Sequence, residues 1–299
     1  MIAEKYVDLY ARNSGLRDKL VAERDVVLTY ALKALVDTRL ANDLAFKGGT
    51  CLRKVVFGSA GRFSEDLDFT LSTSRAQDDV LQEIVEVFNQ AHFDIRFMLD
   101  DYYLTEGDRS FGGDVLYRHA WNASGRFRLQ VSLREHPTLP VRRRPMKPQA
   151  YFKYLEFEPV AVATIEPIEM IAEKLRAAFQ RAKVRDLHDL HAFAGTGFDG
   201  EILRRLVVLK LWQVRDPFDP DVFFERLHGG RYDWDDVRRL TRLDERLDPQ
   251  AIAQTIETRY AFLRQLSELE QQVIRDARTG RNEPIAARLR AEVRKAVGP

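Results

Sequence analysis

The chain has 299 residues, of which 45% are hydrophobic, and its net charge is +1. This length suits one large or two modest globular domains, and the composition excludes an intrinsically disordered chain. A nearly neutral protein has no overall field that attracts nucleic acid, so such binding would depend on local arginine clusters such as Arg142–Arg144. The single cysteine, Cys51, excludes an internal disulfide framework and favours a reducing compartment.

No segment is continuously apolar over the roughly 20 residues that a membrane helix needs. The N-terminal residues 1–5 lack the basic region followed by an apolar run that marks a secretory signal. We therefore expect a soluble cytoplasmic protein that does not bind a membrane.

The first predicted elements lead to a glycine turn. Apolar residues recur every three or four positions over residues 16–38, which predicts a long helix. Residues 43–47 predict a short strand, and Gly48-Gly49 breaks the chain before a helix over residues 50–56. Backbone N–H groups are free at the start of a helix, so this turn is expected to attract phosphate.

Two carboxylates follow on the next predicted strand. Residues 66–71 alternate strictly, which places Asp66 and Asp68 on one face and apolar side chains on the other. Carboxylates two residues apart on a strand lie about 7 Å apart at the backbone and can converge on one Mg²⁺ ion. By itself, the D-x-D pair would usually be a solvated strand edge, and the Gly-Gly pair would usually be a plain turn. Together, in this order, they favour phosphoryl or nucleotidyl transfer, with Gly49 and Thr50 cradling the phosphates of a nucleoside triphosphate (NTP).

The order of strand, glycine turn, helix and D-x-D strand resembles the DNA-polymerase-beta-like nucleotidyltransferase superfamily. A tighter similarity links the chain to AbiEii-type nucleotidyltransferases, the toxin half of abortive-infection and type IV toxin–antitoxin pairs. This resemblance spans about residues 40–195. The segments that carry it are Lys47-Gly48-Gly49-Thr50, Leu52-Arg53-Lys54, Arg62–Phe69, Glu173–Ala177 and Arg185–Leu190.

The resemblance implies an α+β fold. A nucleotidyltransferase core over residues 1–162, built from a mixed sheet with flanking helices, would precede a helical C-terminal lobe over residues 163–299. In the core, residues 126–134 alternate as in a strand, with Arg128 and Gln130 on its polar face. Superfamily members usually present a third carboxylate on this strand, in the place of Gln130. A second metal ion or the general base must then come from elsewhere, or only one ion is held.

The remaining elements are predicted from local patterns. Residues 137–148 are rich in proline and arginine and predict an exposed loop, whereas residues 151–158 and 160–164 predict a strand pair. A helix begins at Pro167, the position that tolerates proline. Further helices are predicted over residues 202–211, 222–227, 235–247, 251–269 and 284–297.

Lys174 and Arg181 lie roughly two turns apart on the helix that begins at Pro167. By itself Lys174 would be expected to pair with a nearby glutamate on the surface. The resemblance implies instead that Lys174 stabilises charge as pyrophosphate leaves. It also implies that Asp186 acts as the base for the acceptor hydroxyl. The alternative for Asp186 is a helix N-terminal carboxylate or a partner of Arg185.

The reaction implied by the resemblance is transfer of a nucleoside monophosphate from an NTP to a hydroxyl, with the 3′ end of tRNA as the expected acceptor. The protein would be a growth-inhibiting or phage-aborting toxin, and its partner an AbiEi-type antitoxin encoded nearby. Two alternatives remain: a small-molecule nucleotidyltransferase of the antibiotic-modifying kind, and a catalytically silent nucleotide-binding module, which Gln130 favours. The predicted catalytic residues are Asp66, Asp68, Lys174 and Asp186, with Asp66 and Asp68 as Mg²⁺ ligands; the predicted nucleotide-binding residues are Lys47, Gly48, Gly49, Thr50, Arg62, Ser64, Arg128 and Arg181.

Overall fold

The computed structural model describes all residues except 106–109, 135, 280–281 and 299. The chain forms two compact units, each described here by itself. Unit 1 comprises Met1–Ile165 and Arg238–Glu245, and unit 2 comprises Glu166–Val237 and Arg246–Pro299. The predicted division after residue 162 lies close to the boundary at Ile165, but the short segment Arg238–Glu245 returns to unit 1.

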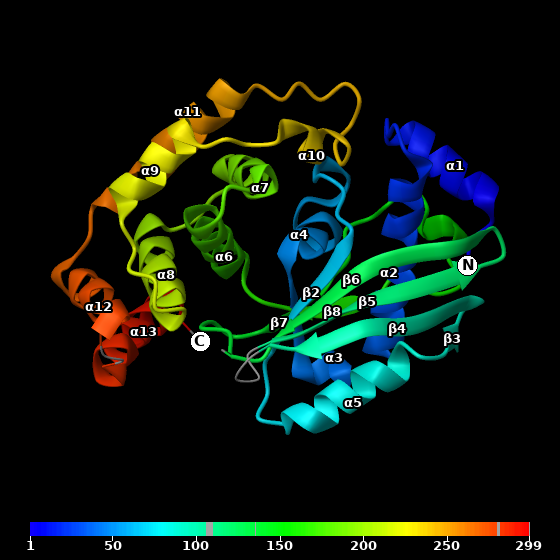
Figure 1. The fold of residues 1–299 in the computed structure, drawn as a ribbon, viewed down its shortest axis with the longest axis horizontal. Helices are drawn as coiled ribbons and strands as arrows, with labels where there is room; N and C mark the ends of the chain where they lie inside the picture. The colour runs from blue at the N-terminus through cyan, green and yellow to red at the C-terminus, as the bar shows by residue number, and fades with distance from the viewer. Residues whose placement is uncertain (106–109, 135, 280–281, 299) are drawn as a thin grey trace. The chain divides into compact units, whose positions relative to one another are not determined.

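Unit 1 contains an eight-stranded mixed sheet with the order β3-β4-β5-β6-β2-β1-β8-β7 (Figure 1). Strand β2 runs parallel to β6, and β1 runs parallel to β8; the other neighbours are antiparallel. The strands are β1 (Leu44–Lys47), β2 (Asp66–Leu71), β3 (Ala91–His92), β4 (Ile95–Leu104), β5 (Ser110–His119), β6 (Asn122–Ser132), β7 (Arg142–Pro145) and β8 (Ala161–Thr164).

Helices α2 and α5 cover one face of this sheet. The ring of Phe88, which follows α5, packs against the rings of Phe97 on β4 and Phe127 on β6, with centroids 5.8 and 5.9 Å apart. In Figure 1 the strands β4, β5 and β6 lie in front of α2, with their other face open. The helical elements of unit 1 are α1 (Glu4–Asn13), α2 (Lys19–Val36), α3 (Leu40–Asp43), α4 (Gly48–Cys51), the π-helix η1 (Leu52–Phe57), the 3₁₀ turns η2 (Gly58–Ala60) and η3 (Phe152–Tyr154), and α5 (Gln77–Val87).

Unit 2 is helical. Helix α8 lies in its centre, because α6, α12 and α13 all pack against it and most of its residues are buried. The helices are α6 (Pro167–Gln180), α7 (Val184–Ala194), α8 (Gly200–Gln213), α9 (Pro220–Gly229), α10 (Trp234–Arg238, whose last residue belongs to unit 1), α11 (Pro249–Tyr260), the 3₁₀ turn η4 (Ala261–Arg264), α12 (Glu268–Thr279) and α13 (Glu283–Val297). Among the described helices, none is both long and apolar enough to cross a membrane.

The predicted α+β class is confirmed, but two segments of unit 1 were predicted wrongly. Residues 142–145 form strand β7 within the predicted loop, and β7 tolerates Pro145 because it is the edge strand. Residues 151–158 contain the turn η3 (Phe152–Tyr154) and no strand, because the N–H groups of Tyr154 and Leu155 bond locally to the carbonyls of Tyr151 and Phe152. Strand β8 pairs instead with β1 and β7.

Two long helices predicted in the C-terminal half are shorter in the structure. Helix α10 ends at Arg238, because the backbone of Leu240 and Leu243 bonds to Phe63 and Gly15 of unit 1 instead of continuing a helix. The helix predicted over residues 251–269 breaks at Tyr260. Helix α12 then starts with a reciprocal cap, in which Ser267 N–H donates to the Glu270 carboxylate and Glu270 N–H donates to Ser267 Oγ.

Candidate active site

Asp66 and Asp68 project from the open face of β2. The neighbouring strands fix their surroundings, because Asp66 is in register with Arg128 and Asp68 with Gln130 of β6. On the other side, Asp68 is in register with Lys47 of β1. Both aspartates are partly exposed, whereas the alternate residue Leu67 is fully buried on the core face. The predicted alternation of β2 is therefore confirmed.

Gly48, the first residue of α4, lies directly against Asp68. Its φ of +76° is a left-handed conformation that favours glycine. A β-carbon at this position would lie 2.1 Å from Asp68 Oδ2. The absence of a side chain therefore brings the start of the helical segment Gly48–Phe57 into contact with one carboxylate of the pair.

Gly49 lies against a second pair of polar side chains. A β-carbon here would lie 2.8 Å from both Arg62 Nη2 and Ser64 Oγ. Both side chains are buried, and Arg62 Nη1 donates to the carbonyl of Phe63 at 3.0 Å. Thr50 Oγ1 donates to the carbonyl of Asp66, which ties the glycine turn to β2. The backbone of the turn is thus flanked by a cation and a hydroxyl, two groups that can bind phosphate oxygens.

The helical segment after the turn is anchored by a buried polar network. Lys54 Nζ lies 2.8 Å from Asp25 Oδ1 and donates to Tyr151 Oη at 2.8 Å, and both charged side chains are fully buried. Tyr10 Oη donates to the other oxygen of Asp25 at 2.8 Å. Arg53 donates to the carbonyl of Gly58 and to Tyr10. These contacts hold the π-helix η1, a rare form that is frequent at functional sites.

Unit 2 holds a separate cluster around one carboxylate. Lys174 Nζ lies 3.2 Å from Asp186 Oδ1 and 2.7 Å from Asp189 Oδ2. Arg181 Nε lies 2.9 Å from Asp186 Oδ2. Asp186 and Asp189 lie on α7 and face the same cation, as their spacing predicts. The Lys174 side chain is only 12% exposed, so it belongs to this cluster with two aspartates and is more than a surface pair along α6.

The two cations determine the ionisation of Asp186. Burial by itself would raise the pKa of this carboxyl, but the charges of Lys174 and Arg181 outweigh burial and hold the pKa below its usual value. The Asp186 side chain is only 1% exposed. A buried carboxylate with a lowered pKa is a weak base, so this geometry suits the positioning of Lys174 and Arg181 better than proton abstraction.

The donor set of unit 1 fits a hard divalent cation. Two carboxylates on one strand face, partly open to solvent, match the preference of Mg²⁺ for one or two protein carboxylates together with water and phosphate. Among the described residues, no group of three or more His, Cys, Asp or Glu side chains is arranged to hold a metal ion. Cys51 is buried, which raises the pKa of its thiol, so it is no candidate for a ligand.

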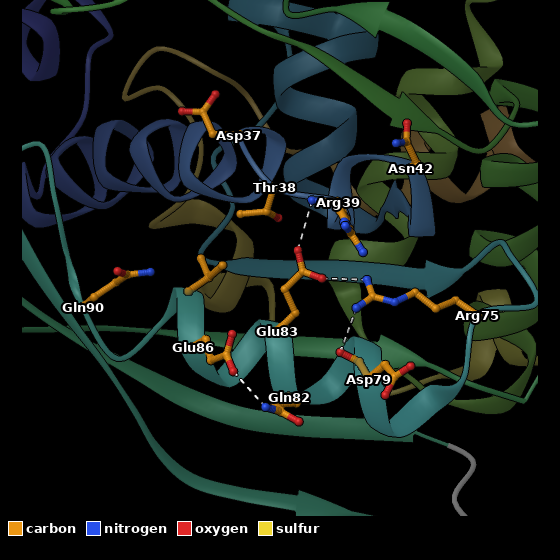
Figure 2. Close-up of a pocket in the computed structure, with 11 residues that line it drawn as sticks. Asp37, Thr38, Arg39, Asn42, Arg75, Asp79, Gln82, Glu83, Glu86 and Gln90 are labelled. Atoms are coloured by element: carbon orange, nitrogen blue, oxygen red, sulfur yellow. Dashed lines mark hydrogen bonds and ion pairs between the residues drawn. The ribbon is translucent and has the colours of Figure 1, made fainter.

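A polar cavity of about 720 Å³ lies elsewhere in unit 1 (Figure 2). Its walls come from the end of α2, from α3 and from α5, so the glycine turn and β2 do not line it. Inside it, Arg75 pairs with Glu83 at 2.6 Å and with Asp43 at 2.9 Å. The Arg75 guanidinium is thus held by two carboxylates, and we assign the cavity no part in the reaction.

Comparison with known proteins identifies the family. The profile described as "Nucleotidyl transferase AbiEii toxin, Type IV TA system" matches residues 30–295. The chain belongs to this AbiEii nucleotidyltransferase toxin family. It is also similar in structure to MenT4, the nucleotidyltransferase toxin Rv2826c from Mycobacterium tuberculosis H37Rv, with 28% sequence identity and a TM-score of 0.81. That match covers 96% of this chain and 99% of MenT4. No curated protein matches the sequence significantly.

Within this AbiEii chain, the structure brings the predicted residues together in two groups. Lys47, Gly48, Gly49, Thr50, Arg62, Ser64, Asp66, Asp68 and Arg128 gather around the glycine turn and β2, and Lys174, Arg181 and Asp186 gather in unit 2. Tyr103, whose hydroxyl accepts a hydrogen bond from Arg128, was not predicted from the sequence. No motif marks Tyr103, because its place depends on the register between β4 and β5 and on Gly112 opposite it.

Proposed function

We propose that this AbiEii-family protein transfers a nucleoside monophosphate from an NTP to a hydroxyl of RNA, with the 3′ end of tRNA as the acceptor. The observation that carries the proposal is the contact between Gly48 and Asp68, which sets the glycine turn against the carboxylate pair. Such an arrangement suits an NTP whose phosphates lie between a metal ion and backbone N–H groups.

The residues of unit 1 have separate tasks in this proposal. Asp66 and Asp68 would hold Mg²⁺, which when bound offsets phosphate charge and orients the triphosphate. Gly49 and Thr50 provide backbone donors, and Arg62 with Ser64 lies beside them to bind phosphate oxygens. Gln130 in register with Asp68 provides an amide where a third carboxylate would bring charge, which favours one metal ion over two.

The tasks of the unit 2 residues rest on the motif that the chain shares with the family. We propose that Lys174 offsets charge on the leaving pyrophosphate, with Arg181 as a further phosphate ligand. Asp186 and Asp189 hold the Lys174 ammonium in one place. Asp186 is then a positioning residue and not the base for the acceptor hydroxyl.

The biological role follows from family membership. A type IV toxin is paired with an antitoxin, and we propose an AbiEi-type protein encoded nearby as that partner, acting in the cytoplasm during growth control or phage infection. Expression without the antitoxin should inhibit growth, and expression of Asp68→Asn should not.

The acceptor is tested by mass analysis of RNA. Total tRNA is incubated with the protein, Mg²⁺ and each NTP in turn, and the intact tRNA masses are compared with those from the Asp68→Asn variant. The proposal predicts a gain of one or more nucleotide residues at the 3′ end with at least one NTP. Transfer to an aminoglycoside or another small hydroxyl compound, with tRNA unchanged, would favour the antibiotic-modifying alternative. NTP binding without any transfer would favour the silent module.

A further inference from the structure

The open face of β4, β5 and β6 carries exposed arginines and apolar side chains that are exposed or half-buried. Strand register and alternation place six such residues on this face, and we call them, together with Tyr103, the outer track: Arg96 and Met98 on β4, Leu116 and Arg118 on β5, and Arg126 and Arg128 on β6. Asp100 and Asp114 lie on the same face, and Arg126 lies 3.9 Å from Asp114. Four arginines against two aspartates leave the track positively charged.

Tyr103 lies at the end of the track that is nearest to the carboxylate pair. Its ring covers Gly112, because a β-carbon there would lie 2.9 Å from the ring. Arg128 Nη2 donates to the Tyr103 hydroxyl, which fixes the ring, and 40% of the residue remains exposed. An exposed, fixed aromatic ring beside an arginine is a platform on which an unpaired base can stack.

The register connects this platform to the proposed catalytic centre. Tyr103, Gly112, Gln130 and Asp68 form one row across β4, β5, β6 and β2. Neighbouring strands are about 4.8 Å apart, so Gly112 lies roughly 10 Å from Asp68 at the backbone. A base on Tyr103 would therefore lie roughly 10 Å from the carboxylates, in the same row across the sheet.

The other end of the track has a cavity of about 530 Å³. Arg96, Met98, Leu116 and Arg118 line it together with Ala123 and Ser124. This volume is within the range of small-molecule sites, and its walls combine apolar groups with guanidinium groups. The apolar walls suit a second base, and the guanidinium groups suit its phosphate.

We propose that the outer track binds the single-stranded end of the acceptor RNA, with a base stacked on Tyr103 and phosphates contacted by Arg96, Arg118 and Arg126. The identity of this ligand as the acceptor rests on the proposed function. Single-stranded RNA is favoured over a duplex because the ring of Tyr103 offers its face to an unstacked base.

Binding is tested without catalysis. A fluorescein-labelled single-stranded RNA of eight nucleotides is titrated with the full chain in the absence of NTP and divalent metal, and fluorescence anisotropy gives the Kd. Tyr103→Leu should weaken binding by roughly 5- to 150-fold, the range produced by loss of one base stack. Tyr103→Phe should bind nearly as wild type, because the ring is retained.

Tyr102→Leu is the matched control. Tyr102 is also exposed, at 56%, but it lies over Gly113 on the opposite face and its ring contacts Phe111. It should bind RNA as wild type does. Equal Kd values for Tyr103→Leu and Tyr102→Leu would overturn the proposal.

Salt dependence tests the arginines. Removing one arginine that binds a phosphate should reduce the slope of log Kd against log salt by about 0.7 for a single strand. We expect this reduction for Arg96→Gln, Arg118→Gln and Arg126→Gln, and not for Arg17→Gln, an exposed arginine elsewhere in unit 1. Slopes unchanged in the first three variants, or reduced instead by Arg142→Gln, would contradict the proposal.

The two proposals can fail separately. If the wild-type chain binds the oligonucleotide through Tyr103 but no NTP labels tRNA, the outer track stands and the transfer reaction fails. If tRNA is labelled equally well by Tyr103→Leu and by wild type, with the same apparent KM for tRNA, the reaction stands and the outer track fails.

Discussion

Gly48 shows how a single missing side chain can organise the proposed site. We predict that Gly48→Ala reduces nucleotidyl transfer by about 10²-fold or more, because a β-carbon would displace the Asp68 carboxylate, and misplacement by about 1 Å has that cost. The variant should also lose roughly 1–2 kcal/mol of stability from its left-handed backbone. Transfer of labelled nucleotide and urea unfolding measure the two effects.

Gly197→Ala is the control for this prediction. A β-carbon at Gly197 would meet nothing within 4 Å, so both activity and stability should be close to wild type. If Gly48→Ala retained full activity, the contact between the glycine turn and Asp68 would have no part in the reaction.

Asp186 gives a prediction for pH. Its folded pKa is held below its usual value of about 3.9, so its ion pairs stabilise the protein above that pH and are lost as pH falls through the folded value. The difference in unfolding free energy between wild type and Asp186→Asn should therefore be large at pH 7 and shrink below about pH 4. Urea unfolding across this pH range measures the difference.

Glu225→Gln is the control. It removes an exposed carboxylate and should show little difference from wild type at any pH. A difference that stays constant for Asp186→Asn would contradict this prediction.

At the scale of elements, the buried pair of Lys54 and Asp25 fixes the helical segment that follows the glycine turn. We predict that Lys54→Met destabilises the protein by about 3–5 kcal/mol, because it leaves the Asp25 carboxylate buried without its cation. The double variant Asp25→Leu/Lys54→Met should be more stable than Lys54→Met, since no unpaired charge remains. Urea unfolding distinguishes these outcomes, and a loss below about 1 kcal/mol for Lys54→Met would show that the pair does not hold the segment.

Elements with strong local signals were predictable from the sequence, and elements defined by distant contacts were not. The alternation of residues 66–71 and Pro167 at a helix start each gave the correct element. The break before α12 also had a local signal, the Ser267–Glu270 capping pair, although the predicted helix ran through it. By contrast, η1 adopts a π-helix whose Arg53 and Lys54 are buried by Tyr10 and Tyr151, far away in the sequence.

The same distinction holds for the site. The sequence predicted that the two aspartates share one face of a strand and that a glycine turn precedes it, because both are short motifs with fixed spacing. It could not predict that Gly112 makes room for Tyr103, since this needs the bulge in the pairing of β4 with β5 between Asp100 and Tyr103. Nor did it predict that Asp186 is enclosed by two cations, which depends on the packing of α6 against α7.

At the scale of the whole molecule, the chain leaves unit 1 at Ile165 and returns to it at Arg238–Glu245. Phe63 N–H donates to the carbonyl of Leu240 at 2.7 Å, and the Leu240 side chain is fully buried.

We predict that Leu240→Ala destabilises the protein by about 2–5 kcal/mol, as for other large-to-small core changes. The matched control is Leu243→Ala in the same segment, which is 57% exposed and should change stability by no more than about 0.5 kcal/mol. Equal effects of the two variants on the urea midpoint would mean that the returning segment is not part of the unit 1 core.

The central claim is that Asp66 and Asp68 together bind the metal ion that carries the NTP. The most direct measurement is transfer of α-³²P-labelled nucleotide to tRNA by wild type, Asp66→Asn and Asp68→Asn over a range of Mg²⁺ concentrations, with circular dichroism as the check on folding. A catalytic metal stabilises the transition state by several kcal/mol. We therefore predict that each variant loses at least about 10³-fold in transfer rate at any Mg²⁺ concentration, although it folds normally. A folded Asp66→Asn or Asp68→Asn protein with wild-type transfer would contradict the claim.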